Sequence, residues 1–185
     1  MNTTTNSDQI KKSYIDYVLT NGEPPKSVYT FAKNLKISEA EFYKFYSGFA
    51  SIEKAVWEDM TQKTLAKIKN QKVWAKYTAR EKVLSFFYSY IEMLKTQRSF
   101  IIYTLKKHTK RLSTPDILSG VKEMFRDFAE ETINEGLDKG ELADRKFFSK
   151  RYKDALWIQF GFIINFWVDD DSPAFEKTDE AIEKG

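Results

Sequence analysis

Residues 27–46, SVYTFAKNLKISEAEFYKFY, decide the fold, because they predict two short helices joined by a tight turn. Ser27 is a good N-cap, and apolar residues recur at helical spacing from Val28 onward. Ser38 begins the second helix through a capping box, in which its hydroxyl accepts from the Glu41 amide and the Glu41 carboxylate accepts from the Ser38 amide. About three residues separate the helices, as in a helix-turn-helix, although an ordinary helical hairpin has the same pattern.

Outside this stretch, helical periodicity dominates and almost no alternating strand pattern occurs. Thr114-Pro115 and Ser172-Pro173 are start signals for two of the later helices. The sequence therefore predicts an all-α fold of about nine helices. Besides the pair above, the expected spans are 10–19, 51–70, 78–95, 99–111, 114 to about 136–140, 144–168 and 172–183.

The first 60 residues resemble the DNA-binding domain of TetR-family transcriptional regulators. Residues 31–32, Phe-Ala, stand where the family has Ile-Ala, and residues 37–38, Ile-Ser, where it has Val-Ser. Residues 42–46, FYKFY, stand where the family has Leu-Tyr-x-His-Phe. Residues 51–53, SIE, resemble the family's Ser-Lys-Glu step into a long fourth helix.

The resemblance implies a TetR-like fold, with a helix-turn-helix DNA-binding domain over 1–50 and a helical ligand-binding and dimerisation domain over 51–185. It implies a cytoplasmic homodimer that binds a double-stranded DNA operator and responds to a hydrophobic or aromatic small molecule. Ser27 and Tyr43 are expected to contact phosphates, and Glu39, Ala40 and Lys44 to contact base edges. The full set of predicted DNA-binding residues is Ser27, Lys36, Ser38, Glu39, Ala40, Tyr43 and Lys44.

Charge is unevenly distributed along the chain. Residues 1–60 contain seven Lys, no Arg and eight acids, whereas DNA binding normally draws on clustered cations. Residues 61–112 carry a net charge of +11, and residues 113–185 carry −7. The basic middle would suit a DNA backbone or an anionic membrane surface, but a solvated helix face is the commoner explanation of such a pattern. Lys36 occupies a turn position that is usually Gly in the family, where positive φ is needed.

Residues 157–168, WIQFGFIINFWV, are apolar on nearly every helical face. This run is too short to span a bilayer, which needs about 20 residues, so no integral membrane segment is expected. Burial against both its own domain and a partner is predicted, with a central helix of a monomer as the alternative. In TetR-like proteins the last two helices pair across a two-fold axis, which implies an interface of Trp157, Gly161, Phe162, Ile164, Asn165, Trp167, Val168 and Phe175.

Aromatic residues make up 16% of the chain and recur at helical spacing between residues 86 and 160. They form either a simple core or a pocket for a hydrophobic ligand, and the resemblance to TetR regulators favours the pocket. The predicted pocket residues are Phe86, Phe87, Tyr90, Phe100, Tyr103, Phe125, Phe128, Trp157 and Phe160.

Catalytic and metal-binding patterns are not found. The chain has no Cys and one His, His108, so it offers neither a thiol nucleophile nor a histidine-based metal site. Residues 169–171, Asp-Asp-Asp, are interpreted as turn, cap and dipole partner rather than as a cation site. We expect no secretory signal, because the residues before the first predicted helix are polar and include no apolar stretch. We therefore expect no catalytic residue, no metal and no cofactor.

A second function fits the same architecture. The lipid-binding protein of ubiquinone biosynthesis is TetR-like without acting as a repressor. The acidic N-terminal segment and the abundant aromatic residues here would suit such a lipid or isoprenoid carrier. A purely structural interaction module has no positive feature in its favour.

Overall fold

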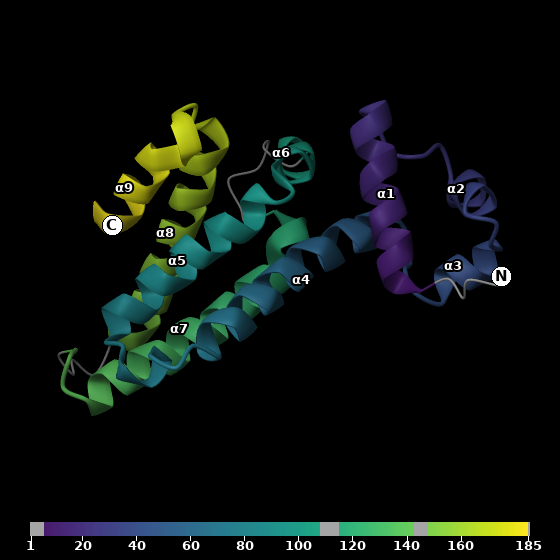
Figure 1. The fold of residues 1–185 in the computed structure, drawn as a ribbon. Helices are drawn as coiled ribbons and strands as arrows, with labels where there is room; N and C mark the ends of the chain where they lie inside the picture. The colour runs from purple at the N-terminus through teal and green to yellow at the C-terminus, as the bar shows by residue number, and fades with distance from the viewer. Residues whose placement is uncertain (1–5, 108–114, 143–147, 185) are drawn as a thin grey trace. The chain divides into compact units, whose positions relative to one another are not determined.

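The computed structural model describes residues 6–107, 115–142 and 148–184, with side chains from residue 151 onward in the last segment. Within these residues the chain is helical and contains no strand, which confirms the all-α prediction of about nine helices (Figure 1). His108 and the predicted helix starts at Thr114 and Asp144 lie outside the described residues. The α-helices are α1 (Ser7–Asn21), α2 (Val28–Asn34), α3 (Glu39–Tyr43), α4 (Phe49–Lys69), α5 (Ala79–Lys95), α6 (Arg98–Lys106), α7 (Ser119–Asp138), α8 (Phe148–Asp169) and α9 (Glu176–Lys184), and the 3-10 helices are η1 (Trp74–Lys76), η2 (Asp116–Leu118) and η3 (Pro173–Phe175).

The chain forms two compact units. The first comprises Met1–Glu58 and Gln97–Ser119, and so contains α1, α2, α3, the start of α4 and α6. The second comprises Asp59–Thr96 and Gly120–Gly185, with the rest of α4 and helices α5, α7, α8 and α9. The boundary after residue 50 between a DNA-binding and a ligand-binding domain stays a prediction.

Two serine caps define the helix-turn-helix, as predicted. Ser27 Oγ accepts from the Thr30 amide at 3.1 Å, and Ser38 Oγ accepts from the Glu41 amide at 3.1 Å. The other half of the predicted capping box is wrong, because the Glu41 carboxylate accepts from Lys44 Nζ at 3.0 Å instead of from the Ser38 amide. Each serine cap stabilises its helix by about 1 kcal/mol.

The turn after α2 is a Schellman motif with lysine in the glycine position. The Ile37 amide donates to the Ala32 carbonyl at 3.0 Å, and the Lys36 amide donates to the Lys33 carbonyl at 3.0 Å. Lys36 has φ 60°, in the left-handed region that the sequence comparison with the family predicted. A side chain there costs roughly 1–2 kcal/mol, which glycine would avoid.

Aromatic rings fill the interior of the first unit. The Tyr14 and Phe49 rings stack with centroids 5.2 Å apart, and Phe31 meets Phe49 edge-on at 5.6 Å. Phe42 packs edge-on against Phe31 at 6.2 Å, so α1, α2, α3 and α4 share one core. Phe45 follows the end of α3 and is 38% exposed, so it lies outside this core.

Helix α6 joins this first unit through polar contacts. Trp57 Nε1 donates to Thr104 Oγ1 at 3.1 Å, and both residues are buried. The buried Glu53 carboxylate accepts from Tyr14 Oη at 2.6 Å and from Lys107 Nζ at 2.8 Å. Burial and the Glu53 carboxylate together raise the pKa of Tyr14, so its hydroxyl stays a donor.

In the second unit, α9 packs against α5 and α8, and α5 also packs against α8. Thr78 and Glu81 form a complete capping box at the start of α5. Close contact between α5 and α7 depends on Gly136, because a Cβ there would lie 2.9 Å from Ala79 Cβ. The buried Lys82 pairs with Glu135 at the same end of the unit.

The connection from α8 to α9 is organised by a buried carboxylate, Asp170. It accepts from the amide and hydroxyl of Ser172 at 2.8 and 2.6 Å, and from the amide and hydroxyl of Thr178 at 2.9 and 2.6 Å. This agrees with the capping role expected for one of the three aspartates. Pro173 opens the short η3, with Ala174 and Phe175 at positive φ, so α9 starts later than predicted.

Pro115 also starts a shorter element than predicted. Its ψ of 141° is extended, and η2 follows it before α7 begins at Ser119. Across the described segments, every helix is too short or too polar to cross a lipid bilayer.

Candidate functional site

The outward face of the helix-turn-helix carries most of the predicted DNA-binding residues. Phe42 is the fully buried residue of α3, whereas Ala40 and Tyr43 are exposed and Glu39 is half-buried. The Tyr43 ring is 52% exposed, so its hydroxyl is free to reach a partner. These side chains could contact an external ligand without disturbing the core.

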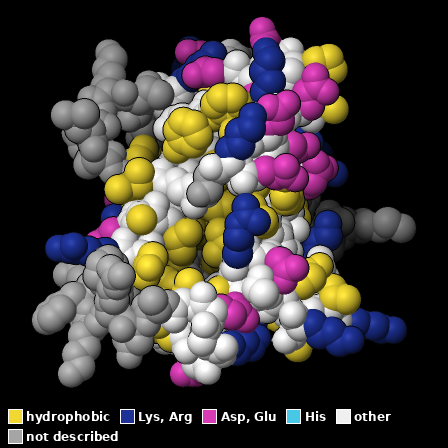
Figure 2. Space-filling view, turned by 90° about the vertical axis from the view of Figure 1, so that its left-hand side faces the viewer, with side chains coloured by type: hydrophobic (Ala, Val, Ile, Leu, Met, Phe, Trp, Pro, Cys, Tyr) yellow, Lys and Arg dark blue, Asp and Glu magenta, His cyan; other side chains and the backbone are white. Residues whose placement is uncertain are grey.

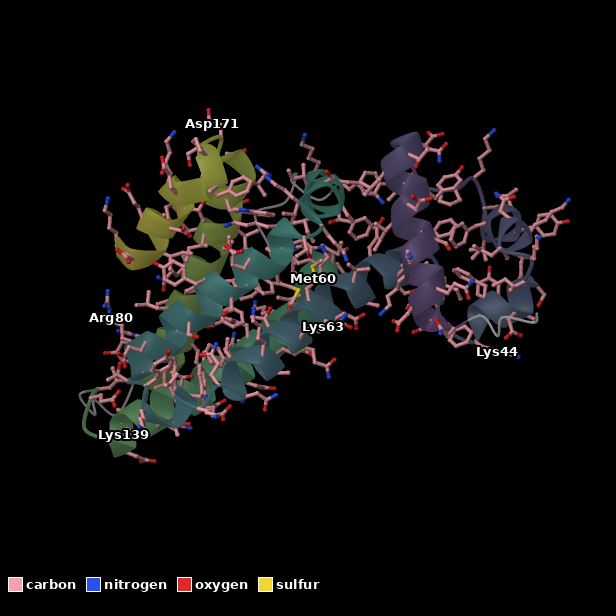
Figure 3. All side chains as sticks on the ribbon, in the orientation of Figure 1. Lys44, Met60, Lys63, Arg80, Lys139 and Asp171 are labelled. Atoms are coloured by element: carbon pink, nitrogen blue, oxygen red, sulfur yellow. The ribbon has the colours of Figure 1, made fainter. Side chains whose placement is uncertain are left out.

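Lys44 lies at the end of α3, where Figure 3 shows it on the outer side of the helix. Its ammonium group pairs with Glu41 at 3.0 Å, so the charge is partly compensated by a carboxylate. A contact from Lys44 to a base edge would have to compete with this ion pair. Helix α3 therefore presents less free positive charge than its sequence suggests.

A hollow of about 480 Å³ lies between α2 and the start of α3. Sequence reasoning selected three of its residues and missed Tyr29 and Lys33, which lie on the side of α2 away from the buried Phe31. Their spacing of four residues on a helix whose buried face was already known is the signal that could have found them. The hollow is lined by Tyr29, Lys33, Lys36, Ile37, Ser38 and Glu39.

The predicted effector-pocket residues fall into both units. Phe100 and Tyr103 belong to the first unit, where Phe100 packs edge-on against Tyr14 at 6.4 Å. The other seven belong to the second unit, and their rings contact one another with centroids mostly 5–6 Å apart. The seven are Phe86, Phe87, Tyr90, Phe125, Phe128, Trp157 and Phe160.

Two polar groups touch this aromatic cluster. The Tyr90 hydroxyl lies 3.2 Å from Thr61 Oγ1, and both residues are fully buried. Burial raises the pKa of Tyr90, so it is neutral at physiological pH. The half-buried Trp157 stacks on Phe160 at 4.8 Å, and Lys122 Nζ lies 5.6 Å from its ring centroid. A ligand that entered here would meet aromatic faces, one hydroxyl pair and one cation.

Helix α8 exposes apolar side chains. Phe162 is 58% exposed and Ile158, which sequence reasoning missed, is 72% exposed. Figure 2 looks onto the side on which α8 and α9 lie, and shows apolar side chains reaching the surface in a hollow between charged ones. A groove of about 460 Å³ continues from Phe162 onto α9, lined by Phe162, Phe166, Lys177, Glu180, Ala181 and Lys184.

The other predicted interface residues differ in exposure. Asn165 is exposed, while Ile164 and Trp167 are buried within the second unit. A Cβ added at Gly161 would meet open space, so nothing in the unit fills the surface beside it. Trp157, Gly161, Val168 and Phe175 are half-buried.

Acidic side chains do not converge on a cation site in the part of the chain that the structure describes. No group of three metal-ligating side chains is found there. The Asp170 carboxylate accepts hydrogen bonds from Ser172 and Thr178. Asp171 projects into solvent just after the end of α8, where it pairs with Lys177 (Figure 3).

Comparison with known proteins gives one family. The model described as "Tetracyclin repressor-like, C-terminal domain" matches residues 82–185, which is more than half of the chain. No curated protein matches the sequence. The fold is similar to the crystal structure of the TetR transcriptional regulator from Nitrosomonas europaea ATCC 19718, with a TM-score of 0.66 and 13% identity over 96% of this chain and 94% of that one. The family match and the all-helical fold together show that this chain belongs to the TetR family.

Proposed function

We propose that this protein is a DNA-binding transcriptional regulator that works as a homodimer and is controlled by a hydrophobic small molecule. The outward face of the helix-turn-helix is the observation that carries the proposal. Glu39, Ala40 and Tyr43 project from α3 while Phe42 holds the helix on the core. This function is non-enzymatic and requires no cofactor.

Sequence readout would come from the first turn of α3. Glu39 can accept from cytosine N4 in the major groove, and Ala40 can contact a thymine methyl group. Tyr43 and Ser27 are suited to phosphate contacts, because both hydroxyl groups are exposed. Lys44 would contact DNA after its ion pair with Glu41 is broken.

Dimerisation is supported by the exposed side chains of α8. A phenylalanine and an isoleucine exposed on one helix are costly in water and gain free energy when a second copy covers them. Two-fold pairing would set two reading heads about 34–36 Å apart, one turn of DNA. Repression rather than activation is the simplest outcome of such binding.

Control by an effector would follow from a population shift. A hydrophobic ligand that separates the rings of the second unit favours a dimer in which the two recognition helices no longer match successive major grooves. Operator affinity would fall by the ratio of the ligand's affinities for the two states. Tyr90 and Thr61 supply the hydroxyl groups for orienting such a ligand.

Salt-dependent binding to DNA tests the proposal. The purified protein would be titrated onto its own upstream DNA and onto a scrambled duplex at several salt concentrations. Specific binding with a steep salt slope is expected, because counterions leave the phosphates on binding. Absent binding, or equal affinity for both duplexes, would contradict the regulator.

A lipid or isoprenoid carrier is the second candidate. The Glu41–Lys44 ion pair favours it, because the recognition helix then carries little free positive charge. Organic extraction of the purified protein followed by mass spectrometry tests this candidate. A stoichiometric lipid in a protein that binds no DNA would support the carrier.

A further inference from the structure

We infer that the hollow between α2 and α3 binds a phosphate of the DNA backbone, and that Lys36 is held in a left-handed conformation for this contact. The inference rests on the proposed DNA-binding function and adds to it a site formed by Tyr29, Lys33 and Lys36. Tyr29 and Lys33 lie outside the set of residues that the sequence predicted to contact DNA.

Free positive charge in the helix-turn-helix gathers at this hollow. Lys33 and Lys36 are exposed, and neither forms an ion pair with a carboxylate of the described residues. Lys44, the cation of the recognition helix, is paired with Glu41. In the same unit Lys54 pairs with Asp116 and Lys107 with Glu53. The hollow therefore offers a phosphate two ammonium groups that need not first leave a carboxylate.

The backbone of Lys36 gives an independent reason. Its φ of 60° is disfavoured for a residue with a side chain, and the Schellman bonds around it use only main-chain atoms. Glycine would make the same turn without strain. The exposed Lys36 side chain is not needed to close the turn, so the strain is retained for something outside the fold. A contact with an external anion explains why a lysine stands here.

The placement fits the way a helix-turn-helix meets DNA. The first helix of the motif crosses the sugar–phosphate backbone while the second enters the major groove. Tyr29 and Lys33 are four residues apart and lie on one face of α2. The Tyr29 ring is 58% exposed, so its hydroxyl can donate to a phosphate oxygen beside the two ammonium groups. The Glu39 carboxylate at the other rim repels a phosphate and favours the base-reading role proposed above.

The experiment measures DNA affinity and thermal stability on the same variants. Lys36→Gly removes both the ammonium group and the strain, Lys36→Arg keeps the charge, and Lys12→Ala removes an exposed lysine of α1 as a control. Each protein is titrated onto labelled upstream DNA over a salt series by fluorescence anisotropy, and its melting temperature is recorded. Lys33→Ala is a second test of the hollow that leaves the turn unchanged.

We expect Lys36→Gly to melt several degrees higher than the wild type and yet to bind DNA about tenfold more weakly at about 0.1 M salt. The slope of log affinity against log salt concentration should become less steep by about 0.9 for each of the two helix-turn-helix motifs of the dimer. Lys33→Ala should reduce the salt slope by a similar amount without raising the melting temperature. Lys36→Arg and Lys12→Ala should keep the wild-type slope.

Three results would overturn the inference, and they can be told apart. In the first, the wild type binds DNA with a steep salt slope and the slopes of Lys36→Gly and Lys33→Ala are unchanged. This result would contradict the phosphate site but not the proposed DNA-binding function. A wild type that shows no salt-dependent binding removes both. Weaker binding by Lys36→Gly accompanied by a lower melting temperature would also contradict the inference, because the loss would then come from damage to the turn.

Discussion

The most exposed large side chains of the two units differ in whether they carry a hydroxyl group. In the first unit the two most exposed aromatic residues are Tyr29 and Tyr43, each with a hydroxyl group, whereas Phe45 is less exposed. In the second unit the two most exposed large apolar side chains of α8 are Ile158 and Phe162, which have no polar atom. A tyrosine suits a wet, hydrogen-bonding partner, whereas exposed phenylalanine and isoleucine gain only when water is removed. The difference indicates two kinds of partner for the two units.

The interiors differ as well. The first unit joins α1, α4 and α6 through a buried carboxylate, a tyrosine hydroxyl and a tryptophan, so part of its stability depends on charge. The second unit is held by a closed cluster of aromatic rings on α5, α7 and α8. Charge changes should therefore disturb the first interior more than the second, apart from the Asp170 cap and the buried Lys82, which pairs with Glu135.

The largest expected effect is on assembly. Phe162→Glu should raise the dimer dissociation constant at least about 100-fold, because it places a charge in the centre of the proposed interface. Tyr29→Glu is the matched control, since Tyr29 is 58% exposed like Phe162 but lies in the other unit. Analytical ultracentrifugation at micromolar concentration would measure both. A Phe162→Glu protein that remains a dimer would contradict the comparison.

The next largest effect concerns the start of α9. Asp170→Asn should lower the free energy of unfolding by about 2–3 kcal/mol, because the charged acceptor of four hydrogen bonds is lost. Asp171→Asn should change it little, because that side chain is 90% exposed and pairs only at the surface. Urea denaturation of both variants gives the comparison, and equal stabilities would show that the cap is dispensable.

The stability that the Asp170 carboxylate contributes should decrease at acid pH. Burial alone would raise the pKa of Asp170, but the hydrogen bonds from Ser172 and Thr178 lower it below its ordinary value. Its contribution is therefore complete above about pH 4, the pKa of an unfolded aspartate, and declines as pH falls below it. The difference in stability between the wild type and Asp170→Asn should shrink from pH 5 to lower pH, measured by urea titrations at each pH.

A smaller effect should follow from the polar interior of the first unit. Lys107→Ala should lower the free energy of unfolding by about 2 kcal/mol, because it leaves the buried Glu53 carboxylate with Tyr14 alone. Lys12→Ala removes an exposed lysine of the same unit and should be neutral. Chemical denaturation measures both. Equal values would mean that the tyrosine hydroxyl suffices for the carboxylate.

The smallest effect is expected at Ser27, where two variants distinguish its role as a helix cap from its expected contact with DNA. Ser27→Ala should lower the free energy of unfolding by about 1 kcal/mol, because the Thr30 amide loses its acceptor. Ser27→Asp should keep the cap while placing a negative charge beside the expected phosphate. Thermal melts and DNA titrations of both variants would show stability retained and affinity reduced for Ser27→Asp. Unchanged affinity would remove Ser27 from the DNA interface.

Local signals in the sequence were sufficient to locate most helices of the fold, although not where α7 and α9 begin. Ser27 and Ser38 cap the helices that they predicted, and the position of Lys36 relative to the family indicated its positive φ before the structure showed it. Such signals depend on residues three to five apart, which the chain brings together in every compact state.

Long-range packing could not be predicted in the same way. Phe86 and Phe100 both belong to the series of aromatic residues at helical spacing, yet Phe86 packs in the second unit and Phe100 in the first. Periodicity identifies the face that is buried but not the element that covers it. At Pro173 the start signal was overridden, because Asp170 holds the residues that follow in a turn with positive φ. The hollow between α2 and α3 likewise depends on two elements, so neither pattern alone revealed Tyr29 and Lys33.

The buried indole of Trp57 has a practical consequence. It is one of four tryptophans, and the only one in the first unit, where it donates to Thr104. The other three, Trp74, Trp157 and Trp167, lie in the second unit. A protein whose other tryptophans are replaced by phenylalanine would therefore carry a native fluorophore that reports on the contact between α4 and α6. Because the chain has no cysteine, a single introduced thiol would accept a dye at one chosen position and supply an energy-transfer partner for that indole.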